Sequence, residues 1–305
     1  MKKLVVLLIV VGLILSVAGC ARYSPTASVG STTIPTPGFS ATPTPSPTLT
    51  SVPTGGELKV HFIDVGQGDS ILIDLGETEV LIDGGEKSPG VVDYLKKYVD
   101  GPLEVMVATH PHSDHIGGLI AVLGAFQVQQ IWDNGDKSDS STYNEFMAAV
   151  QAEGAQVHTG KRGDRITASS LTFLILNPRT LAGTVNNNSI VLSFSYGTVD
   201  FLFTGDAEKE AEGAMLVAAD MPVPDVEVLK VGHHGSRTAS SKDFLAATSP
   251  EVAVYMTGVG NRYGHPHQET IAALAQIGAK VYGTEMNGTI DISTDGNTFT
   301  VHTER

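Results

Sequence analysis

Three histidines and one aspartate stand within six residues of one another, directly after the apolar run at residues 103–108. They are His110, His112, Asp114 and His115. Two histidines separated by one residue can converge on one divalent cation, because imidazole is a common metal ligand. Asp114 and His115, offset along the same turn, are free to face a second cation. The segment therefore predicts a metal site, and specifically one that holds two ions.

Two other apolar segments also end in potential ligands. Asp206 closes the turn that follows residues 201–203, and the two oxygens of a carboxylate can bridge two cations. His233 and His234 follow residues 228–231 and offer further imidazoles. Taken singly, these residues are more often ordinary turn or loop residues. Their shared position at strand ends indicates that they join the histidine cluster at one edge of a sheet.

The elements that must position these residues are predicted from apolar runs and alternation. Strands are expected at residues 58–64, 70–75, 79–82, 103–108, 171–176, 190–196, 199–203, 226–231 and 252–256, with closing strands between residues 280 and 302. Helices are expected at residues 208–219 and 268–277, and after Pro89, where Val91, Val92, Leu95 and Val99 share one helical face. Strands and helices thus alternate in two rounds, which favours an α/β protein of two sheets packed face to face with helices outside.

The N-terminus predicts export. Lys2 and Lys3 precede an apolar run at residues 4–17. This run is shorter than the roughly 20 residues that cross a bilayer, so residues 1–19 are interpreted as a signal peptide. Residues 17–20, Val-Ala-Gly-Cys, resemble the bacterial lipobox, which predicts cleavage before Cys20, its lipidation, and an extracytoplasmic lipoprotein anchored to the cell membrane. The alternative is an incidental small residue at the end of a secretory signal.

Cys20 is the only cysteine in the chain, which excludes an internal disulfide and thiolate metal ligands. Residues 20–56 are rich in Pro, Thr and Ser and predict a disordered spacer between the membrane and a single hydrolase domain at residues 57–305. A role of the spacer in binding a partner is the less favoured alternative.

The predicted domain is acidic. Residues 57–305 contain 16 Lys and Arg against 33 Asp and Glu, a net charge of −17. Proteins that grip duplex DNA generally carry basic patches, so a polyanionic substrate would have to be drawn in by metal ions or by local cations. Such cations are available at Lys161, Arg162 and Arg165. Charge alone, however, favours the interpretation that these three are solvated loop residues.

The motifs in order resemble those of the metallo-β-lactamase superfamily: residues 81–85 (Leu-Ile-Asp-Gly-Gly), 110–115 (His-Pro-His-Ser-Asp-His), 204–206 (Thr-Gly-Asp) and His233. Residues 61–70, 187–192, 229–236 and 261–266 resemble, more narrowly, the ComEC-type competence branch of that superfamily. The resemblance covers essentially the whole domain. The many membrane spans of the competence channel protein are not part of the resemblance, which is confined to its soluble domain.

This resemblance implies an αββα sandwich of two mixed β-sheets with a centre of two divalent metal ions, zinc or manganese. His110 and His112 would hold the first ion, Asp114 and His115 the second, and Asp206 would bridge them. His233 would complete the second site, with His234 as the alternative. The chain departs from the superfamily at residues 184–189, which lack the histidine that usually completes the first site.

The resemblance also implies a mechanism in which a metal-bridging hydroxide attacks a phosphoryl or carbonyl group. Asp114 would orient the hydroxide and take up its proton, and His265 would protonate the leaving oxygen or bind a phosphate. Further residues are expected to bind substrate or to orient the ligands, namely Asp69, Asp83, Asn188, His234, Ser236 and His267. For His265 and His267, a surface or core position is the equal alternative.

Three functions remain open. The leading one is a membrane-anchored metal-dependent phosphodiesterase, with nuclease activity on DNA and cleavage of the non-transported strand. The second is hydrolysis of another ester or amide, such as a phosphorylcholine ester on cell-wall polymers or a β-lactam. The third is a non-catalytic metal-binding module. A phosphodiester, including DNA, is the expected substrate, the lipidated N-terminus is the expected membrane contact, and a monomer is expected.

Overall fold

A computed structural model describes residues 56–305, which lie within one compact unit. The predicted signal peptide, the lipidated Cys20 and nearly all of the predicted spacer lie outside these residues. Within the part that the structure describes, no helix combines the length and the apolar character needed to cross a membrane.

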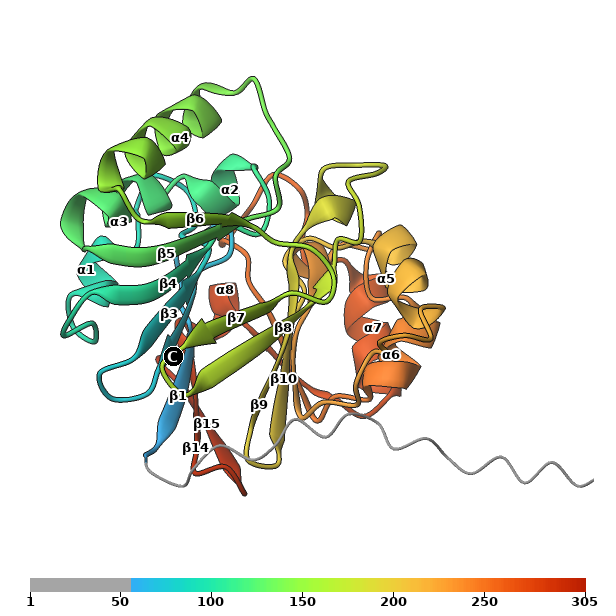
Figure 1. Cartoon of the computed structure of the whole chain (residues 1–305). Helices are drawn as coiled ribbons and strands as arrows, with labels where there is room; N and C mark the ends of the chain where they lie inside the picture. Colours follow the sequence, from blue (N-terminus) through green and yellow to red (C-terminus); the bar gives the residue numbers. More distant parts are fainter. Residues whose placement is uncertain (1–55) are drawn as a thin grey trace, which may run out of the picture. The chain divides into compact units, whose positions relative to one another are not determined.

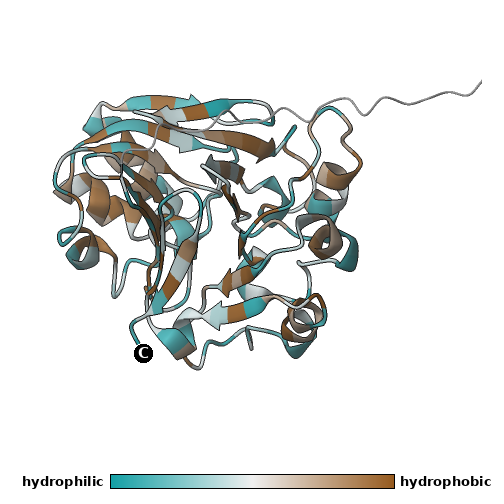
Figure 2. Ribbon diagram, turned by 90° about the horizontal axis from the view of Figure 1, so that it is seen from below, coloured by the Kyte–Doolittle hydropathy of each residue, from teal (hydrophilic) through white to brown (hydrophobic). Residues whose placement is uncertain are grey.

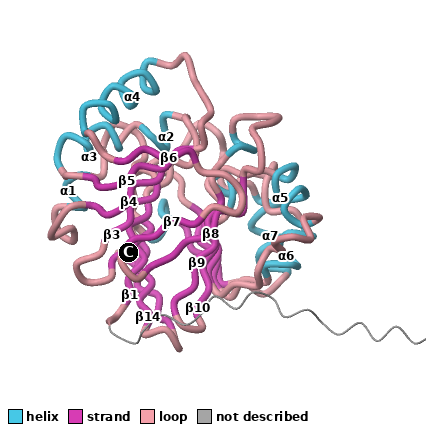
Figure 3. Tube along the Cα trace, viewed as in Figure 1, coloured by secondary structure: helices cyan, strands magenta, loops and turns pink. Residues whose placement is uncertain are grey.

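Two mixed β-sheets form the body of the protein (Figures 1 and 3). The first sheet has eight strands in the order β15-β14-β1-β2-β3-β4-β5-β6. Their bounds are β1 Leu58–Phe62, β2 Ile71–Asp74, β3 Glu79–Ile82, β4 Leu103–Val107, β5 Val128–Asp133, β6 Gln156–Thr159, β14 Ile290–Thr294 and β15 Phe299–Thr303. Strands β3 to β6 are parallel and the others pair antiparallel.

The second sheet has seven strands in the order β13-β12-β11-β10-β9-β8-β7. Their bounds are β7 Arg165–Ala168, β8 Leu171–Asn177, β9 Val191–Tyr196, β10 Val199–Phe203, β11 Val228–Lys230, β12 Val252–Tyr255 and β13 Lys280–Gly283. Strands β10 to β13 are parallel, and β7 to β10 are antiparallel. Each sheet therefore has one parallel half, in which the carboxyl ends of the strands lie at the same edge.

Helices cover the outer face of each sheet (Figures 1 and 3). The first sheet carries α1 Val92–Leu95, α2 Ser113–Ile116, α3 Leu119–Ala125 and α4 Ser141–Glu153. The second carries α5 Lys209–Leu216, α6 Lys242–Thr248 and α7 Gln268–Gln276, while the short α8 Thr284–Asn287 follows β13. The predicted αββα sandwich is confirmed.

Three hydrophobic clusters hold these layers together. The central cluster joins the inner faces of the sheets and includes Phe62, Phe173 and Phe201. The two outer clusters bury the helices, for example Leu119 against the first sheet and Phe244 against the second. Hydrophobic and hydrophilic residues alternate along several strands, as Figure 2 shows, because successive side chains point to opposite faces.

Most differences from the predicted elements are local. The helix expected after Pro89 is short, because only residues 92–95 are helical, although Val91 and Leu95 are buried as expected. The helix expected at residues 208–219 is α5, which begins one residue later and ends three earlier. Several elements were not anticipated, namely α3, α4, α6, β5, β6 and β7.

Candidate metal centre

The histidine cluster begins where β4 ends. Nε2 of His110 lies 3.0 Å from Nδ1 of His112, so two ring nitrogens face each other. Behind this pair, Nδ1 of His110 lies 3.2 Å from the hydroxyl of Thr109 and 3.3 Å from that of Ser189. Two facing imidazole nitrogens either share a proton or bind a cation together, and the hydroxyls fix the ring of His110 from the far side.

Asp206 lies at the centre of the cluster. It follows β10 and is 2 % exposed, and its backbone N–H donates to the hydroxyl of Ser189 at 3.1 Å. Its Oδ2 is 3.7 Å from Nε2 of His110 and 3.4 Å from Nε2 of His115, and its Oδ1 is 3.4 Å from Nε2 of His234. One carboxylate thus contacts imidazoles of both proposed sites.

His115 is oriented by a buried carboxylate. Its Nδ1 donates to Oδ2 of Asp83 at 2.7 Å, which directs Nε2 toward Asp206. Asp83 also accepts hydrogen bonds from the backbone N–H of Thr109 at 2.8 Å and from its hydroxyl at 2.7 Å. A carboxylate that holds the far nitrogen of a histidine is the usual support of a metal-binding imidazole. The structure places Asp83 behind the candidate ligands.

His234, rather than His233, lies beside Asp114. Nε2 of His234 is 3.3 Å from Oδ2 of Asp114, and its Nδ1 donates to the carbonyl of Met256 at 2.9 Å. The sequence predicts His233 at this position, with His234 as the alternative. The two histidines are adjacent in an unusual turn, in which both have positive φ (47° and 54°), and this backbone decides which ring turns inward.

Asp69 is a further buried carboxylate of the centre. Its Oδ1 is 3.2 Å from Nδ1 of His234, and its Oδ2 is 2.5 Å from Nζ of Lys230. Lys230 is 1 % exposed and also donates to the carbonyl of Gly205 at 3.2 Å. No sequence motif identifies Lys230. The available signal is that a lysine stands at the end of an otherwise apolar strand. Its ammonium offsets part of the buried negative charge.

A glycine turn brings Asp69 to the histidine loop. The backbone N–H of Asp69 donates to the carbonyl of Asp114 at 3.1 Å. A Cβ atom on Gly68, whose φ is +124°, would lie 2.1 Å from the same carbonyl oxygen. Only glycine allows this close approach, so the turn at residues 66–68 fixes the distance between Asp69 and the loop that carries Asp114.

Two groups of side chains meet the geometric requirement of a metal site, because their ligand atoms all lie within 4.8 Å of one another. These groups are Asp69, His115, Asp206 and His234, and His110, His112 and Asp206. Nε2 of His115, Nε2 of His234 and Oδ1 of Asp206 are buried without a hydrogen-bond partner. Unpaired buried polar atoms are costly, and three that converge fit the coordination of a cation.

The electrostatics of the cluster agree with this fit. Burial disfavours the charged form of His234, but the carboxylates of Asp206 and Asp69 outweigh it and raise the pKa of His234 well above its usual value. Burial favours the neutral form of Asp206, but His234 and His115 hold the pKa of Asp206 well below its usual value. Burial and the neighbouring His115 lower the pKa of His110. A negative field that attracts protons to buried imidazoles also attracts divalent cations.

His233 and His265 are partly exposed and lie next to each other beside the centre. Nε2 of His233 is 3.9 Å from Oδ2 of Asp206, and its Nδ1 is 3.1 Å from Oε1 of Glu208. The ring of His265 is 5.4 Å from that of His233 and stacks on Tyr263 at 5.7 Å. Burial and the imidazoles of His234, His233 and His267 lower the pKa of His265 to about 4. His265 is therefore neutral at pH 7.

Three of the residues expected to bind substrate or orient ligands make hydrogen bonds within and between the loops around the centre. Asn188 accepts from the backbone N–H of Ala182 at 2.8 Å and donates to Asp136 at 2.8 Å. The hydroxyl of Ser236 lies 2.9 Å from that of Thr238. His267 caps α7 in sequence position, and its Nδ1 accepts from the backbone N–H of Arg237 at 3.2 Å. These contacts shape the loops around the centre.

The cations at residues 161, 162 and 165 differ in their surroundings. Arg162 is not a solvated loop residue as expected: its guanidinium donates to the carbonyl of Leu176 at 2.6 Å and to that of Met221 at 2.5 Å. Its side chain is 4 % exposed. A buried guanidinium that donates to two carbonyls stabilises the fold and is not available to bind a polyanion.

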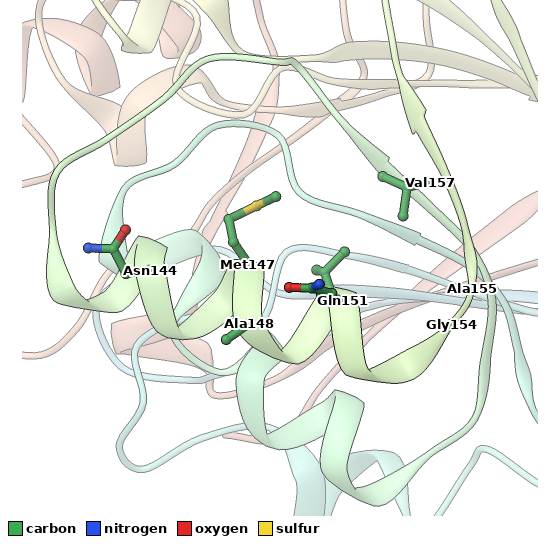
Figure 4. A pocket seen from close by; sticks show the side chains of 8 residues that line it. Asn144, Met147, Ala148, Gln151, Gly154, Ala155 and Val157 are labelled. Atoms are coloured by element: carbon green, nitrogen blue, oxygen red, sulfur yellow. The ribbon is translucent and has the colours of Figure 1, made fainter.

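One cavity lies away from this chemistry. It has a volume of about 660 Å³ and lies over α4 and β6, where its lining includes Asn144, Met147, Gln151 and Val157 (Figure 4). None of the candidate ligands lines it. Since catalysis requires reactive groups and not volume alone, the histidine cluster is the better candidate for the functional site.

The fold and the cluster together define a class. The sandwich of two mixed sheets with outer helices is the metallo-beta-lactamase fold, and its strand ends bring histidines and aspartates into one cluster. The chain belongs to the metallo-beta-lactamase superfamily, whose model matches residues 63–259. This confirms the family predicted from the motifs, and its members are generally metal-dependent hydrolases.

Three relatives narrow the comparison. ComE operon protein 3 of Bacillus subtilis (strain 168) is 31% identical over 77% of this chain, and competence protein ComA of Neisseria gonorrhoeae is 30% identical over 77%. The chain spans about a third of the length of these relatives, 33% and 32%. The metallo-beta-lactamase fold protein YhfI of Bacillus subtilis has a TM-score of 0.51 at 12% identity, with 77% of this chain and 99% of that chain covered, which shows the fold alone. The predicted resemblance to competence proteins is confirmed.

Proposed function

We propose that this chain is a phosphodiesterase of the cell envelope that uses two divalent metal ions, zinc or manganese, and that DNA is its substrate. The observation that carries the proposal is the pair of ligand groups that share Asp206. When bound, two such cations would supply a hydroxide nucleophile at neutral pH and would neutralise charge on the attacked phosphoryl group. A shared carboxylate at the centre of two imidazole groups is the donor set that such a pair requires.

Asp114 is proposed as the residue that orients the nucleophile and accepts its proton. Its carboxylate lies 3.3 Å from Nε2 of His234. Burial favours the neutral acid, but the hydrogen bond to His234 and the charge of His115 hold the pKa of Asp114 well below its usual range. The carboxylate is therefore ionised at neutral pH and available as an acceptor.

His265 is proposed to bind the phosphate of the substrate. With a pKa of about 4, its imidazole is neutral at pH 7 and donates a hydrogen bond through one nitrogen. This favours phosphate binding over proton donation, the other role considered. The guanidinium of Arg262, 4.9 Å from the ring of Tyr263 in the same loop, adds a positive charge beside it.

DNA is favoured as the substrate by the similarity to competence protein ComA, and cleavage of the non-transported strand is the specific version that we propose. The net charge of −17 over residues 57–305 favours the second candidate, a small ester such as a phosphorylcholine group on cell-wall polymers. We also propose that the protein is a monomer held at the membrane by a lipid on Cys20.

The test is hydrolysis of single-stranded DNA, duplex DNA and bis(4-nitrophenyl) phosphate by the purified protein with Mn²⁺ or Zn²⁺. Asp206→Asn is the matched control, because it keeps the size of the side chain and removes the bridging charge. Metal-dependent DNA cleavage that the variant lacks supports the nuclease. Cleavage of the small diester alone moves the substrate to the second candidate. No hydrolysis with either metal argues against the phosphodiesterase.

A further inference from the structure

His233 and His234 approach the same carboxylate from the same turn. Nε2 of His234 lies 3.4 Å from Oδ1 of Asp206, whereas Nε2 of His233 lies 3.9 Å from Oδ2. Both residues have positive φ, which is uncommon for residues with a side chain and persists mainly at functional sites. This backbone directs two neighbouring imidazoles at the two oxygens of one aspartate.

His233 is oriented in the way that metal ligands are. Its Nδ1 is 3.1 Å from Oε1 of Glu208 and 3.0 Å from the hydroxyl of Thr238. With the proton of Nδ1 directed at these oxygens, Nε2 keeps its lone pair on the side of Asp206. His115 has the same arrangement with Asp83. A histidine with a purely structural role does not require both an acceptor at Nδ1 and a carboxylate near Nε2.

The position of His233 also bears on the histidine that the loop at residues 184–189 lacks. Oδ2 of Asp206, which faces His233, also lies 3.7 Å from Nε2 of His110 and 3.4 Å from Nε2 of His115. The loop itself reaches His233, because the amide of Asn186 lies 3.4 Å from both of its ring nitrogens. His233 thus lies beside Asp206, which both groups of ligands share, and the first group has only two imidazoles of its own.

We propose that His233 is the third imidazole of the first metal ion and that Glu208 holds it in place, so that the two adjacent histidines serve different ions. The inference rests on the proposed two-ion centre. The first ion would be held by His110, His112, His233 and Asp206, and the second by Asp114, His115, His234 and Asp206. Each ion then has three protein ligands of its own, the number typical of catalytic zinc, and shares Asp206 with the other ion.

The experiment measures Co²⁺ binding to the full chain by equilibrium dialysis and by absorption in the visible region, where tetrahedral Co²⁺ is strongly coloured. Four proteins are compared, namely the unmodified protein and the variants His233→Ala, His234→Ala and His302→Ala. His302 lies on β15 and is exposed, so it controls for the loss of a histidine as such. Circular dichroism of the metal-free proteins checks that the variants fold.

We expect two Co²⁺ per chain for the unmodified protein and for His302→Ala. His233→Ala and His234→Ala should each keep one tight ion and bind the other at least about 10-fold more weakly, with different absorption spectra because different ions are affected. In Glu208→Gln, both ions should bind, the first about 10–100-fold more weakly.

Two Co²⁺ bound to His233→Ala with unchanged affinities and spectrum would overturn this inference and leave the two-ion centre intact. A single Co²⁺ on the unmodified protein would instead overturn the two-ion centre, and with it the assignment of His233. The measurement does not depend on turnover, so a wrong choice of substrate does not affect it.

Discussion

At the scale of single residues, the candidate ligands are held in place by buried residues that contact them or their neighbours from outside the centre. Asp83 holds His115, and Lys230 holds Asp69, which in turn lies against His234. Neither supporting residue points at the centre itself. Their substitution should therefore separate the geometry of the ligands from their identity.

Asp83→Asn should weaken metal binding about 10–100-fold, because the amide cannot offer a charged acceptor to Nδ1 of His115. The variant keeps the size of the side chain and retains an oxygen for the backbone N–H of Thr109. Competition of Zn²⁺ between the protein and a chromogenic chelator measures the affinity. Unchanged affinity would mean that Asp83 serves the loop and not the ligand.

Lys230→Met should lower the free energy of unfolding by about 3–5 kcal/mol at pH 7, because it removes the buried ammonium that pairs with the carboxylate of Asp69. The double variant Lys230→Met/Asp69→Asn should regain most of this loss, because no charge is then left uncompensated. Urea denaturation of the metal-free proteins measures both. Equal stability of the single variant and the unmodified protein would contradict the ion pair.

Which histidine turns inward lay beyond the sequence. Motif order predicts that the cluster at residues 110–115 meets Asp206, and the structure brings His110, His112 and His115 into two groups with Asp206 whose ligand atoms lie within 4.8 Å. His233 and His234, by contrast, are chemically identical neighbours. Their roles depend on two successive left-handed backbone conformations, which no local propensity predicts for histidine. Glu208 and Lys230 belong to the surroundings of the centre through contacts distant in sequence.

At the scale of elements, apolar runs predicted the central strands well because those strands are buried on both faces. The apolar pattern predicts no element within residues 119–170, although they contain α4, a helix of 13 residues. Only Phe146 and Val150 of α4 are buried, so the apolar periodicity that marks a helix is weak there. The exposed β6 has no buried residue and is equally hard to recognise.

Acidic residues crowd the ends of β2, β3 and β4 that lie away from the centre. Glu79 is fully buried and pairs in register with Asp74, and its backbone N–H donates to Glu104 at 2.9 Å. Burial, with the charges of Glu104, Asp100 and Asp74, raises the pKa of Glu79 to about 7. The folded protein therefore binds this proton more tightly than the unfolded chain does.

Glu79→Gln should be more stable than the unmodified protein at pH 8, by about 2 kcal/mol, because the unmodified protein must ionise a buried carboxyl. Since the pKa is raised on folding, this carboxyl loses stability as pH rises from about 4.5 to about 7. The difference between the two proteins should vanish near pH 4. Thermal unfolding across this range measures it, and a difference independent of pH would contradict the shifted pKa.

At the scale of the whole molecule, the sequence predicts a tether as well as an enzyme. Cys20→Ser should move the protein from the membrane fraction to the soluble fraction of the envelope, because the hydroxyl cannot carry the lipid. Fractionation with immunodetection measures this, and incorporation of labelled palmitate identifies the modification. A variant that stays in the membrane fraction would favour an uncleaved apolar segment at residues 4–17.

The centre draws its side chains from both halves of the sandwich. His110 and His115 follow β4 of the first sheet, whereas Asp206 and His234 follow β10 and β11 of the second. A bound ion is then a non-covalent cross-link between the sheets, and a free ion concentration of 100 times its Kd adds about 2.7 kcal/mol to the free energy of unfolding. A chelator should lower the calorimetric Tm, and Asp206→Asn should lose that response. The persistence of the folded protein would thus depend on the supply of metal around it.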